Sequence, residues 1–395
     1  MNHVKLTHSK KATSRLPVLL IFLFAAMDVS IIGPFLAPIV RSYSISFSWI
    51  GIILSAKNLA RLIFDVPTAI FSDMFGAKLL FTISRISRII SVAMIIMLDS
   101  EIALVVAMFL YGLSMSSFYG KIEPYIIQYS NNSNKESNQK LLSSYFLMSS
   151  FVMLGCGTLS SYLFPKIGYV ALGVYTIITA ASSLLLLPFM PNVNIESKKR
   201  EKKSFALIFK TSLKNMYENK EVANLVLSLS VINVIIWRSN NIVNITLLSM
   251  NVRPQIISII GTVHFGCTII GYFVTITKLK LKLKTVKIIT ICSFVSIAIF
   301  IPMLNWFSLL VFLVSSVVLP ASQINYEKRL GSILKSGNLS TVISFTGLIS
   351  SICVIFLGVL NGYLNGFLPS NTVLVITITP MLAVILLLQF IGNNK

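Results

Sequence analysis

Charge is scarce in this sequence, and acidic residues are scarcer than basic ones. Only 11% of the 395 residues are charged, and 33 Lys and Arg stand against 12 Asp and Glu, which gives a formal net charge of +21. Apolar residues make up 55%, and the mean hydropathy is +0.85. A soluble domain cannot bury so much apolar surface, so the composition indicates a polytopic membrane protein.

Residues that carry metal, disulfide or nucleotide chemistry are few. The four cysteines are isolated within apolar stretches and the three histidines show no ligand spacing, so neither a metal site nor a disulfide framework is indicated. Gly120-Lys121 is followed by Ile122, without the Ser or Thr of a Walker A loop, which argues against ATP as the energy source. Acids clustered at a membrane face, which a polytopic enzyme would need, are missing too. We therefore expect no cofactor, no metal and no enzymatic activity.

Long apolar runs, in contrast, are abundant. A helix needs about 20 apolar residues to cross a bilayer, and runs of this length predict twelve membrane spans. They cover 16–40, 47–72, 79–98, 102–127, 141–164, 168–189, 222–250, 254–277, 286–304, 306–326, 340–363 and 372–391. The first run is too long for a secretory signal peptide and no A-x-A site follows it, so we expect it to be retained.

Lys and Arg gather in every second connection between the predicted spans. The runs SKKREKKS (197–204) and KLKLKLKTVK (278–287) lie on one side, whereas the other side holds only Arg41, Lys166 and Arg253. Basic residues are enriched in cytoplasmic connections, which predicts a plasma-membrane (inner-membrane) protein with both termini in the cytoplasm. The positive charge then forms a solvated rim beside anionic lipid. A nucleic-acid role is not indicated, because no connection is long enough to fold into a basic domain.

The longest polar break divides the spans into two groups of six. This predicts an N-terminal six-helix bundle over 1–190, a cytoplasmic central loop over 191–221 and a C-terminal six-helix bundle over 222–395. The connections after the second and the eighth span both end in basic residues, although Thr275 stands where the first has an acid. Such weak internal similarity predicts a degenerate six-plus-six repeat.

The stretch FDVPTAIFSDMFGAK (64–78) between the second and third spans carries the most specific motif. Its acid, its Pro-Thr pair and the later Asp73, Gly76 and Lys78 resemble the signature of the major facilitator superfamily, an acid and Pro-Thr-Gly followed by Asp-Arg-x-Gly-Arg-Lys. Ala69, Met74 and Ala77 depart from that signature. The resemblance extends to the twelve spans and the basic central loop. It implies an all-α membrane protein with two pseudo-symmetric six-helix bundles, in which this loop braces one conformational state and binds no substrate.

The chemistry of this loop motif can also be read from its residues. Gly76 permits a backbone turn that is closed to other residues. Asp73 can cap the next helix or lie at its positive end, and Lys78 can reach lipid phosphate or a neighbouring carbonyl. The alternative interpretation is a generic tight cytoplasmic turn with flanking charges.

Three charges share one face of the second span. Lys57, Arg61 and Asp65 are spaced i, i+4, i+8, which places them along one side of a helix. Exposure to lipid would cost several kcal/mol per charge, so this side should face protein or a watery cavity. Arg61 and Asp65 can pair one turn apart. Two interpretations stay open, an ion pair that pins two helices and a lining of the translocation path.

Depth in the membrane sorts the other charges. Asp28 and Arg238 fall near the middle of the first and seventh spans, which the resemblance places along a central cavity. Glu123 lies about two turns from the cytoplasmic face, with Arg85 and Arg88 nearby. The arginines either belong to this layer or snorkel to the surface. The candidate substrate and proton pathway is Asp28, Lys57, Arg61, Asp65, Glu123 and Arg238. The lone His264 is either a titrating group or a hydrogen-bonded packing residue.

The function that these features favour is secondary active transport. We expect a monomer that exports a small organic molecule in exchange for protons by alternating access, because the resemblance is to the drug-and-metabolite exporter branch. An uptake symporter of the same fold, and a non-transporting receptor or lipid flippase, remain as alternatives. Asp28 and Asp65 should include the carboxylate that carries the proton. Replacing each by Asn should abolish gradient-driven transport and leave the protein folded.

The charges near the middle of the membrane also suggest the class of substrate. Lys57, Arg61 and Arg238 exceed the single carboxylate of Asp28. An excess of cations in a weakly screened cavity favours an anionic or zwitterionic ligand with carboxylate or phosphate groups, such as a carboxylate-rich metallophore or a small antibiotic.

Overall fold

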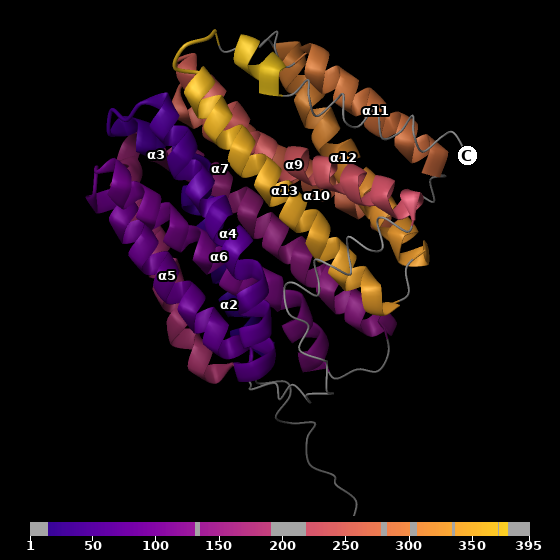
Figure 1. The fold of residues 1–395 in the computed structure, drawn as a ribbon. Helices are drawn as coiled ribbons and strands as arrows, with labels where there is room; N and C mark the ends of the chain where they lie inside the picture. Colours follow the sequence, from indigo (N-terminus) through magenta and orange to yellow (C-terminus); the bar gives the residue numbers. More distant parts are fainter. Residues whose placement is uncertain are drawn as a thin grey trace, which may run out of the picture. The chain divides into compact units, whose positions relative to one another are not determined.

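The computed structural model describes residues 15–130, 135–190, 219–277, 283–300, 306–333, 336–369 and 371–377, and its regular structure there is entirely helical (Figure 1). The elements are α2 (Arg15–Ile32), η1 (Gly33–Phe35), α3 (Leu36–Ser42), α4 (Phe47–Phe75), α5 (Ala77–Met97), α6 (Glu101–Ser130), α7 (Lys135–Leu186), η2 (Leu187–Phe189), α9 (Lys220–Ser249), α10 (Pro254–Thr277), α11 (Leu283–Phe300), α12 (Trp306–Ile333) and α13 (Ser336–Leu364). The predicted all-α fold is therefore confirmed.

The helices follow the predicted spans closely. Every span from the first to 340–363 corresponds to a described helix, while most of 372–391 lies outside the described residues. The first span is divided into α2, η1 and α3, with Pro34 in the 3-10 turn. Proline lacks an N–H and collides with the carbonyl of the preceding turn, which explains why α2 ends at Ile32. Seven segments among the described residues are long and apolar enough to cross a membrane.

The long element α7 contains two predicted spans. Its backbone is non-helical at Gly168, where φ is 72° and ψ is 175°, and Pro165 precedes this point. The sequence predicts a connection between 164 and 168 at this place. A positive φ is readily accessible to glycine but strained for other residues, so Gly168 allows the break between the two spans.

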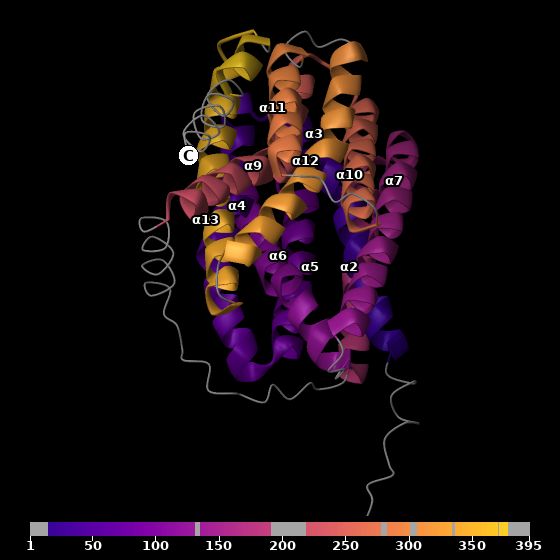
Figure 2. The same ribbon diagram turned by 90° about the vertical axis from the view of Figure 1, so that its right-hand side faces the viewer.

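By their contacts, the described residues form two compact units. The first is drawn from Met1–Leu36 and Ile63–Arg200, and the second from Ala37–Leu62 and Glu201–Lys395. In the first unit α7 packs against α2 and α5, and α5 against α6. In the second unit α12 packs against α10 and α11, and α9 against α13 (Figure 2). The predicted division into bundles at 191–221 is not tested by this arrangement and stays a prediction.

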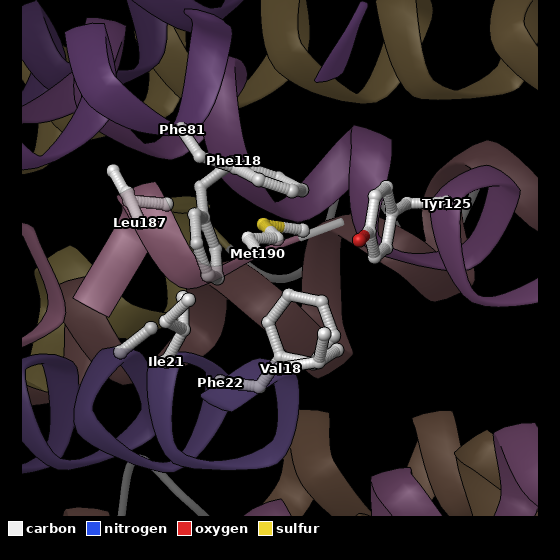
Figure 3. Close-up of a cluster of buried hydrophobic side chains, with 9 residues drawn as sticks. Val18, Ile21, Phe22, Phe81, Phe118, Tyr125, Leu187 and Met190 are labelled. Carbon is white, nitrogen blue, oxygen red and sulfur yellow. The ribbon is translucent and has the colours of Figure 1, made fainter. Parts of the chain in front are cut away.

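An aromatic cluster joins α2 to its neighbours in the first unit (Figure 3). The Phe22 ring of α2 meets Phe81 of α5 and Phe118 and Tyr125 of α6 edge-on, with centroids 6.0, 5.8 and 6.3 Å apart. Edge-to-face contacts add to the energy of burying the rings. The cluster therefore fixes the mutual positions of α2, α5 and α6, the helices that carry the charged residues described below.

In the second unit, α4 and α13 approach each other at glycines. A Cβ added to Gly51 would lie 2.6 Å from the Gly358 carbonyl oxygen, and one added to Gly362 would lie 2.7 Å from the Gly51 Cα. Next to them, Ser55 Oγ donates a 3.4 Å hydrogen bond to the Ile355 carbonyl. Small residues allow membrane helices to pack backbone against backbone. This region is called the glycine crossing below (Gly51, Ser55, Gly358 and Gly362).

Candidate functional site

A buried ion cluster lies inside the first unit. Asp28 of α2 meets Arg85 and Arg88 of α5, and the three side chains have no solvent exposure. Arg85 Nη1 donates to Asp28 Oδ2, and Arg88 Nε lies 3.7 Å from Asp28 Oδ1. The spacing of three residues places both guanidinium groups on one side of α5. Asp28 is thus the counter-ion of two arginines.

Each arginine of the cluster also lies on an aromatic ring of α6. The Arg85 Cζ is 4.3 Å from the centroid of Phe118, and the Arg88 Cζ is 3.7 Å from that of Tyr111. The negative face of an aromatic ring attracts a cation, and the attraction grows when water is excluded. The two rings therefore stabilise the positive charge that a single carboxylate does not neutralise.

Hydroxyl groups fasten α5 to α6 beside the cluster. Ser84 Oγ accepts a 2.9 Å hydrogen bond from Arg85 Nη2 and donates to the Ser114 carbonyl at 2.7 Å. Ser91 Oγ donates to the Ala107 carbonyl, also at 2.7 Å. Such polar contacts between helices are favourable where no water competes for them. They hold α5 so that both arginines point toward α2.

The sequence indicates Asp28 as a candidate residue but not its partners. From sequence, Arg85 and Arg88 are expected either in a layer with Glu123 or snorkelling to the surface. The complete burial of both side chains excludes snorkelling. The available signal was the pair of arginines three residues apart within an apolar span. Depth along each helix follows from the sequence, but the side of α5 that turns toward α2 does not.

The charges of α4 are in a different environment. Lys57 and Arg61 are half-buried and Asp65 is exposed. The Arg61 Nε is buried and has no hydrogen-bond partner in the described part of the chain. The salt bridges found there involve Arg85, Arg88 and Arg329 but not Arg61, so the predicted pairing of Arg61 with Asp65 is not formed. Two further pathway candidates, Glu123 on α6 and Arg238 on α9, have side chains outside the described residues.

The loop motif adopts the predicted turn. Gly76 has a φ of +83° and precedes the first residue of α5, a conformation that favours glycine. Lys78 Nζ donates to the carbonyls of Pro188 and Met190 at 3.1 and 3.3 Å, so of the two predicted partners the structure has the neighbouring carbonyl. These two carbonyls lie just past the end of α7, where a cation also complements the negative end of that helix's dipole. The side chain of Asp73 lies outside the described residues.

Removing the Lys78 ammonium should loosen the attachment of η2 to α5. We expect Lys78→Met to lower the free energy of unfolding by about 1 kcal/mol, because hydrogen bonds from a charged donor contribute more than neutral ones and this donor is only partly buried. The melting temperature of the purified protein in detergent measures the effect. Lys220→Met, which removes an exposed cation at the start of α9, is the control and should change little. Equal effects of the two substitutions would contradict this assignment.

His264 is a packing residue in the second unit. It is buried on α10, its Nδ1 lies 2.6 Å from Ser316 Oγ of α12, and its ring stacks on Phe312 with centroids 4.8 Å apart. Because Ser316 Oγ uses its only hydrogen toward the Phe312 carbonyl at 2.7 Å, it accepts from the imidazole, and His264 Nδ1 is the donor. Of the two interpretations of His264, the hydrogen-bonded packing residue is confirmed.

Comparison with known proteins places the fold among membrane transporters. The crystal structure of the nucleoside transporter NupG superposes with a TM-score of 0.72 at 15% identity, over 98% of this chain and 99% of that one. The structure of a D-xylose-proton symporter gives a TM-score of 0.65 at 13% identity, over 95% and 97%. At such low identity these similarities establish the fold and not the substrate.

Sequence comparisons give the same result. The chain is 25% identical over 218 residues to the uncharacterized MFS-type transporter YxaM of Bacillus subtilis (strain 168), and this match spans 52% of each protein, about half the length of that curated relative. The family model of the Major Facilitator Superfamily matches residues 18–391. Family and fold point to a transporter rather than an enzyme, in a multi-pass membrane protein. The chain belongs to the major facilitator superfamily.

Proposed function

We propose that this protein is a secondary active transporter that exports a small organic molecule in exchange for protons. The observation that carries the proposal is that charged side chains lie within helices long and apolar enough to cross a membrane, namely Asp28 on α2 and Lys57, Arg61 and Asp65 on α4. Ionisable residues inside membrane helices are costly and mark ion and substrate paths. In a transporter that works by alternating access, such residues can bind the substrate or the proton.

Uptake is the second candidate. Two proteins of similar fold are named as a nucleoside transporter and a D-xylose-proton symporter, and a symporter uses the same parts with the opposite direction of net substrate flow. Export remains our first proposal because the sequence resembles the drug-and-metabolite exporter branch of the family. We place the protein in the plasma membrane with both termini in the cytoplasm, on the basis of the basic connections.

The proposed substrate carries a carboxylate or a phosphate, alone or together with an amine. Lys57, Arg61 and Arg238 supply positive charge in the middle third of their helices. In a weakly screened cavity they would attract anions and repel lipophilic cations. We expect Arg238→Ala to weaken anion binding more than it lowers stability. Tight binding of an ethidium-like cation that Arg238→Ala leaves unchanged would contradict the proposed substrate class.

Proton coupling is tested with the purified protein in liposomes that contain a pH-sensitive dye. A pH gradient is imposed and proton flux is recorded on addition of dicarboxylates, organic phosphates, nucleosides and xylose. We expect Asp65→Asn to reduce substrate-dependent proton flux at least about tenfold, because the amide cannot bind and release a proton. Reversing the gradient separates export from uptake.

Asp99→Asn is the matched control for this experiment. Asp99 is an exposed acid between α5 and α6, so its loss removes an equal charge from outside the helices. Both variants should elute from size-exclusion chromatography as the wild type does. Substrate-dependent proton flux in Asp65→Asn at the wild-type level would remove Asp65 from the coupling mechanism.

A further inference from the structure

The exposed surface of α4 has one strongly apolar side. Ile52, Leu59 and Ile63 are 37, 40 and 47% exposed. With about 100° of rotation per residue, these three side chains lie within about 40° of one another around the helix axis. In a membrane-spanning helix, such a stripe of large apolar residues is the side that meets lipid.

The charged side of α4 lies opposite this stripe. Lys57, Arg61 and Asp65 span about 80° of rotation, and the centre of their arc is about 180° from the centre of the apolar stripe. Lys57 and Arg61 are half-buried and Asp65 is exposed. Because the apolar stripe is the side suited to lipid and a charge facing lipid is costly, the partial exposure of this charged side indicates contact with water inside the membrane.

The two remaining sides of α4 are closed by protein. Gly51 and Ser55 point to α13 through the glycine crossing. On the other side, Ile53, Ala56 and Ala60 are buried. Among the described side chains from Ile50 to Asp65, only the charged side combines exposure with polar groups.

The charged side opens only partway along the helix. Toward the helix start it is closed by Ile50 and Leu54, which are both buried. It opens at Lys57, and Arg61 is the fifteenth of the 29 residues of α4. The opening therefore extends from near the middle of the helix toward Asp65.

Arg61 differs from Arg85 and Arg88 in its surroundings. Arg85 and Arg88 are fully buried and share Asp28, so the charge of Asp28 is already used within the first unit. Arg61 takes part in none of the salt bridges found in the described residues, and its Nε has no hydrogen-bond partner there. Arg61 as a whole is half-buried, and its planar guanidinium carries further N–H donors that suit a ligand.

We propose that Arg61 binds the anionic group of the transported molecule directly. A carboxylate or phosphate oxygen pair fits the guanidinium in a two-point contact, and Lys57, one turn away, supplies a second positive charge. The inference rests on the proposed transport function. It names Arg61 as the residue that determines specificity for anions and assigns Arg85 and Arg88 to the internal cluster.

The test measures the preference for anions directly and needs no knowledge of the substrate. In a full-length protein with all four native cysteines replaced by Ser, Asp65→Cys places a thiol one turn from Arg61. The purified protein in lipid nanodiscs is treated with methanethiosulfonate reagents that carry either a sulfonate or a trimethylammonium group. We expect the sulfonate reagent to react about tenfold faster or more, because a cation one turn away attracts it and repels the other.

Three further substitutions in the Asp65→Cys protein assign the effect. Arg61→Gln should reduce the preference at least about fivefold, and Arg61→Lys should keep most of it, because the charge remains. Lys166→Gln, which removes an exposed cation in the connection between two predicted spans of α7, is the matched control and should leave the preference unchanged. If Asp65→Cys does not fold, Lys57→Cys probes the same position from the preceding turn.

Three outcomes would overturn the inference: equal rates for the two reagents, a preference that survives Arg61→Gln, or no reaction of either thiol. The liposome assay distinguishes a failure of the Arg61 inference from a failure of the proposed transport function. If the wild type shows gradient-driven flux but the thiol test gives one of these three outcomes, the role of Arg61 is wrong and the proposed transport function stands. A thiol preference that depends on Arg61, in a protein without gradient-driven flux, removes proton-coupled transport and leaves an anion-binding site.

Discussion

The Asp28→Asn variant is expected to lose about 3–5 kcal/mol of stability, the range observed when one partner of a buried ion pair is removed. The substitution leaves the guanidinium groups of Arg85 and Arg88 inside the protein, where neither has any solvent exposure. The amide that replaces the carboxylate can accept a hydrogen bond but carries no charge. The measurement is the yield of monodisperse protein and its melting temperature in detergent. The sequence alone predicts that the Asp28→Asn variant stays folded. Because Asp28 is buried between two arginines, we now expect this variant to be destabilised.

Removing an arginine from the same cluster should have a smaller effect. Arg88→Gln leaves Asp28 and Arg85 as a balanced pair, and its main loss is the contact with Tyr111, an interaction of about 1–2 kcal/mol. Adding Arg88→Gln to Asp28→Asn should restore part of the lost stability, because one buried cation remains in place of two. The counter-ion role of Asp28 is wrong if Asp28→Asn has the melting temperature of the wild type. It is also wrong if adding Arg88→Gln does not raise the melting temperature of Asp28→Asn.

The second large effect is expected at the glycine crossing. We expect Gly51→Ala to destabilise the protein by about 1–3 kcal/mol, the typical cost of adding a group where no space exists. The new methyl would lie 2.6 Å from the Gly358 carbonyl oxygen and 2.9 Å from the Gly362 Cα. These are backbone atoms, so no rotation of a side chain can relieve the collision. Thermal melting in detergent and the rate of limited proteolysis report the change.

Gly347→Ala is the matched control, because Gly347 lies on α13 and a Cβ there would meet no atom within 4 Å. Alanine favours a helix over glycine by up to about 1 kcal/mol, so this control should be neutral or stabilising. Gly362→Ala should behave like Gly51→Ala, since its methyl would lie 2.7 Å from the Gly51 Cα. A Gly51→Ala protein as stable as the control would show that α4 and α13 are not packed in this way.

The helices could be predicted because crossing a membrane requires a long run of apolar residues, which is visible in the sequence. The span predicted over 254–277 has the same ends as α10, and the predicted span 47–72 differs from α4 by three residues at its end. Apolar length and the position of basic residues are local properties of the chain. The break at Gly168 coincides with the connection predicted between 164 and 168. The break after Ile32, beside Pro34, was not predicted, because the apolar run 16–40 is continuous.

The site could be predicted only in part, because pairing between helices depends on their rotation. The depth of Asp28 pointed to an important residue, yet nothing near it in the sequence indicates Arg85, 57 positions away. For Lys57, Arg61 and Asp65, the periodicity gave the shared face, and the exposures of the three side chains agree with it. The absence of an Arg61–Asp65 pair was not predictable, since a spacing of four residues permits an ion pair without requiring one.

Phe118 belongs both to the aromatic cluster and to the ion cluster, since its ring packs on Phe22 and also lies under Arg85. Leucine could fill the same volume but has no ring face for the guanidinium, so natural variation at these two positions should be linked. Homologues that keep arginine at position 85 are expected to keep an aromatic residue at position 118. Those with an apolar residue at 85 should tolerate an aliphatic one at 118. A family alignment can therefore reveal the coupling between packing and charge in this protein as covariation of these two columns.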